Sequence, residues 1–286
     1  MKKRFLLRFL IAIVFISSSP NLNAQKISTK ELIKKMHDGI AKYRHLRFTL
    51  YRSERVDGEQ VIGSFNGKLC MDPFMIYIKN MVPNEGSELL YKEGENNNKA
   101  WVNPDIFPYI TMSFYPESNL LKAGGHHTLK DAGFDLLDEI FRSYEKTYKD
   151  ELFNYITNKG LVKWNNSNYY KIILNYPDYK IETYRTKENE SLLKIAKDKL
   201  VNSYKLTELN PSYKENKTLP EGKDIAIPNA YAKRFIMYID SKTFLPLYQE
   251  IYDEIGLYEK YVYKNVVFEE QIPKEEFSID YKEYGF

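Results

Sequence analysis

The sequence predicts an α+β fold in which helices cover one face of an antiparallel sheet. Three observations point to it: an amphipathic helical pattern near the start, a long series of segments with alternating apolar residues, and a second amphipathic helical pattern in the middle. Helical segments beside a meander of strands joined by short turns are typical of antiparallel α+β domains. A chain of 286 residues is also long enough to bury a substantial core.

The first helix is predicted to begin near residue 28. Ser28 and Glu31 form a capping-box pattern. Apolar residues then recur at helical spacing, namely Leu32, Ile33, Met36, Ile40 and Tyr43. This segment is therefore expected to be an amphipathic helix with one apolar face.

Strands are expected from residue 46, because the apolar spacing there falls to two. Leu46, Phe48 and Leu50 alternate with more polar neighbours up to the turn at Asp57 and Gly58. Further strands are predicted at 61–71, 74–79, 87–92 and 99–103, with Pro, Gly and Asn residues at the breaks. The alternation then loosens between residues 104 and 133.

The second helix is predicted from Phe134 to about residue 159. Its apolar stripe consists of Phe134, Leu137, Ile140, Phe141 and Tyr144, and it should cover an apolar surface. Strands resume at 161–165 and 169–176, and then at 233–240, 247–252 and 257–268.

The N-terminus has the layout of a secretory signal peptide. Four positive residues precede an apolar stretch of eight residues, Phe9 to Ile16, and a small residue follows at Ala24. The stretch is shorter than the roughly 20 apolar residues that a membrane-spanning helix needs. We therefore expect an exported, soluble periplasmic protein whose signal peptide, residues 1–24, is cleaved near Ala24.

The charge of the chain argues against a nucleic-acid partner. Lys2, Lys3, Arg4 and Arg8 lie in the predicted signal peptide, and removing them from the formal net charge of +3 leaves −1. A mature chain without a basic surplus lacks the electrostatic basis for binding phosphate backbones. The single cysteine, Cys70, excludes an internal disulfide.

No pattern in the sequence predicts catalysis or metal binding. His126 and His127 with Asp131 could suggest a metal site, but zinc-ligand spacings such as i and i+4 pairs of histidines are absent. We expect the two histidines to cap or orient the helix that follows Gly133. The carboxylates of Asp135, Asp138 and Glu139 are expected on a solvated helix face, and nucleophile and phosphate-binding motifs are also absent. The prediction is a non-enzymatic protein without a cofactor.

Residues 180–228 differ from their neighbours and resemble a LysM domain. A strand leads into Asn189, Glu190, Ser191 and Leu192, and the closing part contains Gly222, Ile225, Ile227 and Pro228. Between these ends stand Ile195, Ala196, Leu206, Leu209, Asn210 and Pro211. The resemblance implies a βααβ module, which we place at residues 179–229 as an insert in a body formed by 25–178 and 230–286. Leu200 departs from the pattern, because the family often has glycine there and leucine tolerates positive φ poorly.

LysM domains bind glycans built on N-acetylglucosamine, chiefly peptidoglycan or chitin, between two loops. By resemblance, the glycan-binding residues here would be Lys187, Asn189, Glu190, Ser191, Asn210, Pro211, Ser212 and Tyr213. Because most of the match lies in hydrophobic framework positions, a purely structural insert remains an equal alternative.

The body resembles proteins related to the lipoprotein carrier LolA. Gly63, Phe65, Gly67 and Lys68, with Pro73 and Tyr77, are similar to two adjacent strands of that group. The C-terminal run with Asp240, Pro246, Asp253 and Gly256 extends the likeness, and Gly125, His126, His127 and Gly133 point to the DUF1571 branch. The resemblance implies a curved antiparallel half-barrel with helices in its open mouth.

Such a half-barrel leaves an apolar groove in which acyl chains can be buried, at about 0.8 kcal/mol per methylene. The expected groove residues are Phe48, Leu50, Phe65, Leu69, Ile76, Ile78, Trp101, Phe134, Tyr261 and Tyr263. The same residues could instead form a filled core, since periodicity does not distinguish the two. Two functions therefore remain possible predictions. In the first, the protein holds peptidoglycan through its LysM-like module and offers the groove to a lipid or another partner. In the second, it is a lipid or lipoprotein carrier whose module is only structural.

Overall fold

A computed structural model describes residues 27–107, 109–122 and 124–286. The predicted signal peptide, residues 1–24, and its cleavage site lie outside the described residues. Among the described residues, no helix combines the length and the apolar character needed to cross a membrane.

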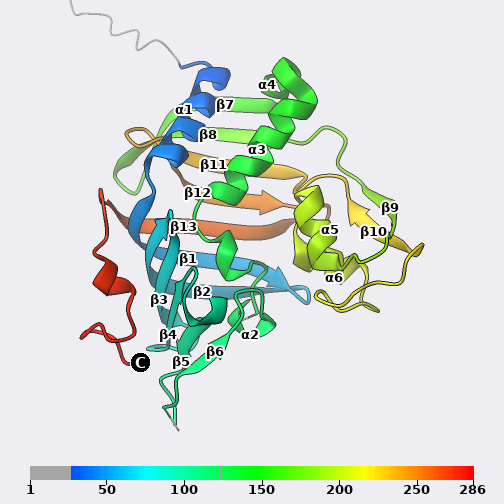
Figure 1. The fold of residues 1–286 in the computed structure, drawn as a ribbon. Coiled ribbons are helices and arrows are strands. Elements are labelled where there is room, and N and C mark those ends of the chain that lie inside the picture. Colours follow the sequence, from blue (N-terminus) through cyan, green and yellow to red (C-terminus); the bar gives the residue numbers. More distant parts are fainter. Residues whose placement is uncertain (1–26, 108, 123) are drawn as a thin grey trace, which may run out of the picture.

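A single large antiparallel sheet forms the body, in the order β6-β5-β4-β3-β2-β1-β13-β12-β11-β8-β7 (Figure 1). β6 and β7 are its edges, so the curved sheet stays open. Its strands are β1 (His45–Val56), β2 (Glu59–Met71), β3 (Phe74–Val82), β4 (Glu88–Lys92), β5 (Ala100–Asn103), β6 (Met112–Phe114), β7 (Ile156–Trp164), β8 (Ser167–Asn175), β11 (Arg234–Asp240), β12 (Pro246–Tyr252) and β13 (Leu257–Phe268). The predicted α+β fold with an open antiparallel sheet is confirmed.

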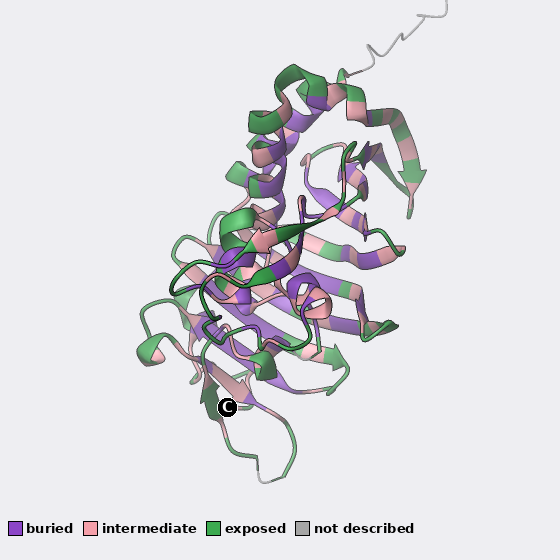
Figure 2. Ribbon diagram, turned by 90° about the vertical axis from the view of Figure 1, so that its right-hand side faces the viewer, coloured by how far each residue is buried: buried purple, intermediate pink, exposed green. Residues whose placement is uncertain are grey.

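Two long helices, α1 (Thr29–Lys42) and α3 (Asp135–Tyr148), lie across one face of this sheet (Figure 1). Their apolar stripes join the inward-facing strand residues in the main core. The other helical segments of the body are α2 (Asn119–Lys122), α4 (Leu152–Tyr155), η1 (Asn96–Asn98), η2 (Leu129–Asp131), η3 (Lys149–Glu151) and η4 (Lys274–Phe277). Figure 2 shows the buried residues concentrated where helices and strands face each other.

The second helix is shorter than the sequence predicts. α3 ends at Tyr148 instead of near residue 159, because Lys149 adopts φ 51° and breaks the helical path. After η3 and α4, β7 begins at Ile156 and pairs with β8, so residues 156–159 are strand. The helical pattern of the sequence continues through these residues, but their pairing with β8 makes them a strand.

The opposite face of the sheet is covered by the C-terminal segment. Cys70, Met75, Tyr77 and Leu90 point to this face and pack against Ile272 and Phe277 in a separate cluster. Neighbouring residues of the same strands, such as Leu69 and Ile76, point to the main core, as the period of two requires.

Residues 181–228 form a βααβ unit beside the main sheet. β9 (Ile181–Arg185) pairs with β10 (Asp224–Pro228) in a two-stranded sheet, and α5 (Leu192–Lys199) and α6 (Ser203–Leu209) lie between them in the chain. The unit has its own core, made of Leu192, Ile195, Ala196, Val201, Leu206, Leu219, Ile225 and Ile227. We call residues 181–228 the inserted module below. Leu200 adopts the left-handed conformation that glycine would favour, with φ 51° and ψ 49°.

Candidate functional site: a cavity with a polar end

A cavity of about 190 Å³ lies between the sheet and the segment that leads into α3. Its walls are mostly apolar and include Leu137 and Ile140 of α3 together with Leu89 of β4. Val82, which is half exposed, belongs to the lining at the end of β3. The space between sheet and helices is therefore only partly filled by side chains.

Six of the ten predicted groove residues line this cavity, namely Phe48, Leu50, Phe65, Ile78, Tyr261 and Tyr263. The remaining four do not line it. Leu69 and Ile76 are adjacent on β2 and β3 and are fully buried in the main core. Phe134 packs against Tyr263 with ring centroids 4.7 Å apart, and Trp101 packs on the opposite face of the sheet.

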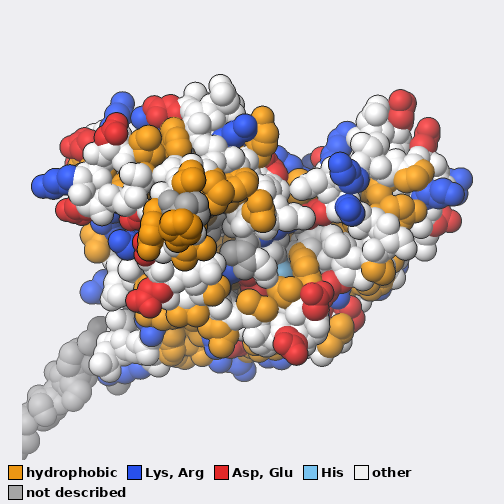
Figure 3. Space-filling model, turned by 90° about the horizontal axis from the view of Figure 1, so that it is seen from below, with side chains coloured by type: hydrophobic (Ala, Val, Ile, Leu, Met, Phe, Trp, Pro, Cys, Tyr) orange, Lys and Arg blue, Asp and Glu red, His pale blue; other side chains and the backbone are white. Residues whose placement is uncertain are grey.

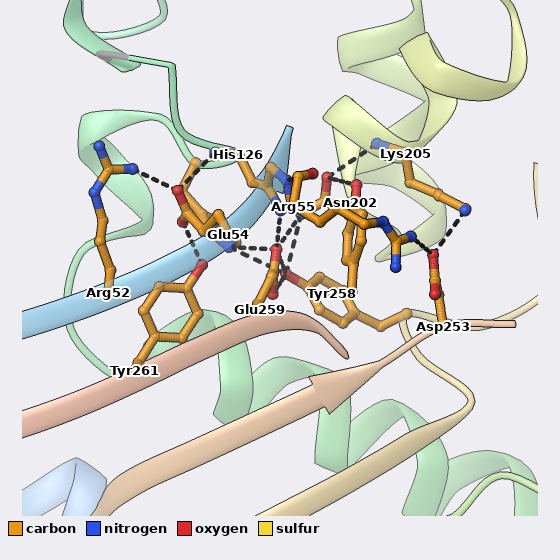
Figure 4. Close-up of polar contacts among 12 residues, drawn as sticks. Arg52, Glu54, Arg55, His126, Asn202, Lys205, Asp253, Tyr258, Glu259 and Tyr261 are labelled. Atoms are coloured by element: carbon orange, nitrogen blue, oxygen red, sulfur yellow. Dashed lines mark hydrogen bonds and ion pairs between the residues drawn. The ribbon is translucent and has the colours of Figure 1, made fainter. Parts of the chain in front are cut away.

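One end of the cavity carries a buried polar network centred on Glu259 of β13 (Figure 4). The carboxylate accepts hydrogen bonds from Asn202 Nδ2 at 2.7 Å and from the Tyr231 hydroxyl at 3.0 Å. His126 Nδ1 and His127 Nε2 lie 2.8 and 3.2 Å from Glu259 Oε1. Segments far apart in the sequence thus meet at one carboxylate.

Glu54 of β1 forms a second centre next to Glu259. Its carboxylate accepts from the Tyr261 hydroxyl at 2.5 Å and from the backbone N–H of His126 at 3.3 Å, and it pairs with Arg52. Gly125 permits this approach, because a Cβ at that position would overlap Arg52 Nη1 and Glu54 Oε2. The glycine before the two histidines is therefore a steric requirement of the site.

The charges of the network shift one another's pKa values. Burial alone would raise the pKa of Glu259, but the charge of His127 and the hydrogen bonds from both histidines outweigh burial and lower this pKa to about 2. Burial would likewise lower the pKa of His127, yet the charges of Glu259 and Asp131 and the hydrogen bond to Glu259 raise it well above 6.5. Glu259 is therefore ionised at neutral pH, and His127 is its cationic partner.

The histidines therefore differ in role from the prediction. They were expected to cap or orient the helix after Gly133, but His126 is 1 % exposed and bonds to Glu259 and to the Arg55 carbonyl. Among the described residues, no group of three or more His, Cys, Asp or Glu side chains is arranged to hold a metal ion. Glu54 and Glu259 were not predicted, because each lies within an ordinary alternating strand pattern.

The helix-face carboxylates are only partly solvated, unlike the prediction. Asp138 Oδ1 lies 2.5 Å from His37 Nδ1, and this contact joins α3 to α1. Asp138 also pairs with Arg142. Asp135 forms two hydrogen bonds with Arg44, whereas Glu139 is exposed.

The inserted module meets the body at this polar end. Asn202, the N-cap of α6, contacts Glu259, and Lys205 lies 2.9 Å from Asp253 and 2.7 Å from Glu254. Asp253 also pairs with Arg55 of β1. These contacts connect the module to the strands that line the cavity.

Three of the eight predicted glycan-binding residues have structural roles inside the module. Glu190 accepts from the Tyr184 hydroxyl and the Lys187 N–H, Asn210 bonds to the backbone of Leu206 and Ala226, and Ser191 caps α5. Lys187, Asn189, Pro211 and Ser212 are exposed, whereas Tyr213 packs against the module core. Ser191 also borders a hollow of about 380 Å³ with Tyr115, Glu117 and Asn216.

Apolar side chains gather on the protruding connection between β5 and β6. Ile106, Phe107, Tyr109 and Ile110 are each more than half exposed. Figure 3 shows exposed hydrophobic side chains clustered on this face of the molecule.

Comparison with known proteins finds a family model that matches part of this chain. The model of the family described as "Protein of unknown function (DUF1571)" matches residues 43–180, which confirms the predicted resemblance for this part of the chain. The match includes Glu54, His126 and His127, whereas Glu259 lies outside it. A comparison with curated proteins found no match.

Similar solved structures are distant in sequence. A LolA superfamily protein from Nitrosomonas europaea shares 9 % identity over 89 % of this chain and 99 % of its own, with a TM-score of 0.34. The lipoprotein LppX from Mycobacterium tuberculosis shares 10 % identity over 86 % and 99 %, with a TM-score of 0.41. LprF from Mycobacterium bovis shares 10 % identity over 85 % and 95 %, with a TM-score of 0.40.

Proposed function

We propose that this chain is an exported, periplasmic binding protein that holds the apolar part of a lipid, or the acyl chain of a lipoprotein, in the cavity of its body. The observation that carries the proposal is the mostly apolar space of about 190 Å³ between the sheet and α3. The proposed role is binding and not catalysis, because the charged groups at its polar end already pair with one another.

Burial of an alkyl chain would supply the affinity. An apolar cavity of about 150 Å³ is enough to take up benzene, and the space here is larger. Each methylene moved from water into it contributes about 0.8 kcal/mol. A chain entering past Val82 would meet Leu50, Leu137 and Ile140.

A fluorescent alkyl probe and native mass spectrometry test this proposal. Leu136 lines the cavity, so Leu136→Phe should reduce probe affinity by about tenfold, the equivalent of about 1.4 kcal/mol. Leu161→Phe is the matched control, since Leu161 is 55 % exposed on β7 and outside the lining. Probe binding that is absent in the unaltered protein, or equal in both variants, would contradict the proposal.

A second proposed function is glycan binding by the inserted module. The exposed side chains of Lys187 and Asn189 and the hollow beside Ser191 support it. Co-sedimentation with purified peptidoglycan at low salt is the test, with Lys187→Ala and Asn189→Ala as variants that spare the module core. If the protein stays in the supernatant, the module does not bind peptidoglycan. It is then a structural insert of a lipid or lipoprotein carrier.

A further inference from the structure

We propose that the cavity takes amphiphiles whose head group is uncharged and donates a hydrogen bond, such as fatty alcohols or monoacylglycerols, in preference to free fatty acids. This inference rests on the proposed function, because it names the class of ligand for the same cavity. It follows from the charged groups that line the polar end, Arg52, Glu54, Lys122, His127, Asp131 and Glu259.

Every cation in this set already has a carboxylate partner. Arg52 pairs with Glu54, and Lys122 Nζ lies 2.5 Å from Glu215 Oε1 with both side chains buried. His127 lies 3.2 Å from Glu259 and 3.8 Å from Asp131. An entering carboxylate would therefore have to displace an existing partner to obtain a counter-charge.

The carboxylates outnumber the cations at this end. Glu54, Asp131 and Glu259 line the cavity, and Glu215 adds a fourth beside the three cations Arg52, Lys122 and His127. The charge of His127 and hydrogen bonds from Thr128 hold the pKa of Asp131 below its ordinary value despite burial, so it is ionised at neutral pH. A buried anionic head group would meet repulsion from these carboxylates and would also lose its hydration.

Asp131 offers an acceptor to a head group that can donate. Thr128 and His127 both contact its Oδ2 atom, and Oδ1 has no partner among the described residues. A hydroxyl group can donate to Oδ1 in a charge-assisted hydrogen bond, which is about twice as strong as a neutral one. A fatty-acid carboxylate can only accept, so it gains nothing at this atom.

The experiment compares decanol, methyl decanoate and decanoate as competitors of a neutral fluorescent probe at pH 7.5. We expect decanol to bind at least about tenfold more tightly than decanoate, with the ester between them because it cannot donate. Decanoate binding as tightly as decanol would overturn the inference and leave the proposed function intact. If none of the three displaces the probe, the proposed function fails and the inference fails with it.

Asp131→Asn tests the assigned residue, since it removes the charge and keeps the size. The variant should bind decanoate severalfold more tightly and decanol more weakly. The ratio of the affinity for decanol to the affinity for decanoate should therefore fall. Asp135→Asn is the matched control, because Asp135 pairs with Arg44 and does not line the cavity. Thermal unfolding of both variants checks that the fold is intact. An unchanged ratio in folded Asp131→Asn would contradict the role of Asp131.

Discussion

At the scale of single residues, the carboxylate of Glu259 joins three parts of the chain that are separate in sequence. It is fully buried and bonds to the loop of His126 and His127, to α6 through Asn202, and to Tyr231 before β11. A buried carboxylate is tolerated only when its oxygens are paired, and here four side chains meet that need.

Glu259→Gln should lower the free energy of unfolding by about 3–5 kcal/mol, because it leaves the buried cation of His127 without its counter-charge. Chemical denaturation at pH 7 measures this loss. Glu270→Gln, at an exposed position after β13, is the control, and its change in the free energy of unfolding should be near zero. A loss below about 1 kcal/mol at Glu259 would contradict the role assigned to its carboxylate.

The same variant should change the dependence of stability on pH. Because folding lowers the pKa of Glu259 from 4.5 to about 2, its stabilisation is present above pH 4.5 and is lost as the pH falls toward 2. His127 has a raised pKa, so its stabilisation is complete below pH 6.5 and is lost as the pH rises through its folded pKa. Denaturation series across both ranges should show flatter curves for Glu259→Gln than for the unaltered protein.

The sequence could not reveal this network, although it contains every member. His126 and Glu259 are 133 positions apart, so only the folded sheet brings them together. Adjacent residues Tyr258 and Glu259 are both buried, which breaks the alternation that would place one of them on a solvated face. Six of the groove residues were predictable because period-two alternation assigns a face, but it does not say where on that face a cavity remains.

At the scale of elements, the turn between α5 and α6 is closed by a strained residue. Leu200 adopts φ 51°, a conformation that costs an L-residue other than glycine about 1–2 kcal/mol. The sequence indicated this position, because the LysM-like pattern has glycine there. The unit forms nonetheless, since its eight core residues outweigh the strain.

Leu200→Gly should therefore raise the free energy of unfolding by about 0.5–1 kcal/mol, the relieved strain less the greater flexibility of the unfolded chain. Asn189→Gly is the comparison, with φ 59° at a residue type that tolerates it, and should change stability by less than about 0.5 kcal/mol. Urea denaturation of both variants measures these changes in the free energy of unfolding. Destabilisation by Leu200→Gly would mean that its side-chain packing outweighs the strain.

The two helices of the module differ in what their N-caps do. Ser191 caps α5 by accepting from Lys194 N, while Asn202 caps α6 by accepting from Lys205 N and also donates to Glu259. Ser191→Ala should cost about 1 kcal/mol, the usual value of a cap. Asn202→Ala should cost about 2–4 kcal/mol, because it also removes a hydrogen bond to a buried carboxylate. Equal losses in thermal unfolding would show that the contact with Glu259 contributes nothing.

At the scale of the whole molecule, buried polar contacts join the module to the body. From the module, Lys205 pairs with Asp253 and Asn202 donates to Glu259. From the body, Lys122 of α2 pairs with Glu215 of the module. These charges would be costly to separate from their partners. We therefore expect a single cooperative transition in calorimetry, whereas two separate transitions would show that the module folds independently.

The cavity itself is the central claim, and a methyl NMR titration with decanol tests it most directly. We predict saturable shifts at Ile78, Leu137 and Ile140, which line the cavity, and none at Ile172 and Leu174, which are fully buried elsewhere in the core. Shifts confined to the exposed Ile106 and Ile110, or no saturable shift at all, would contradict the account.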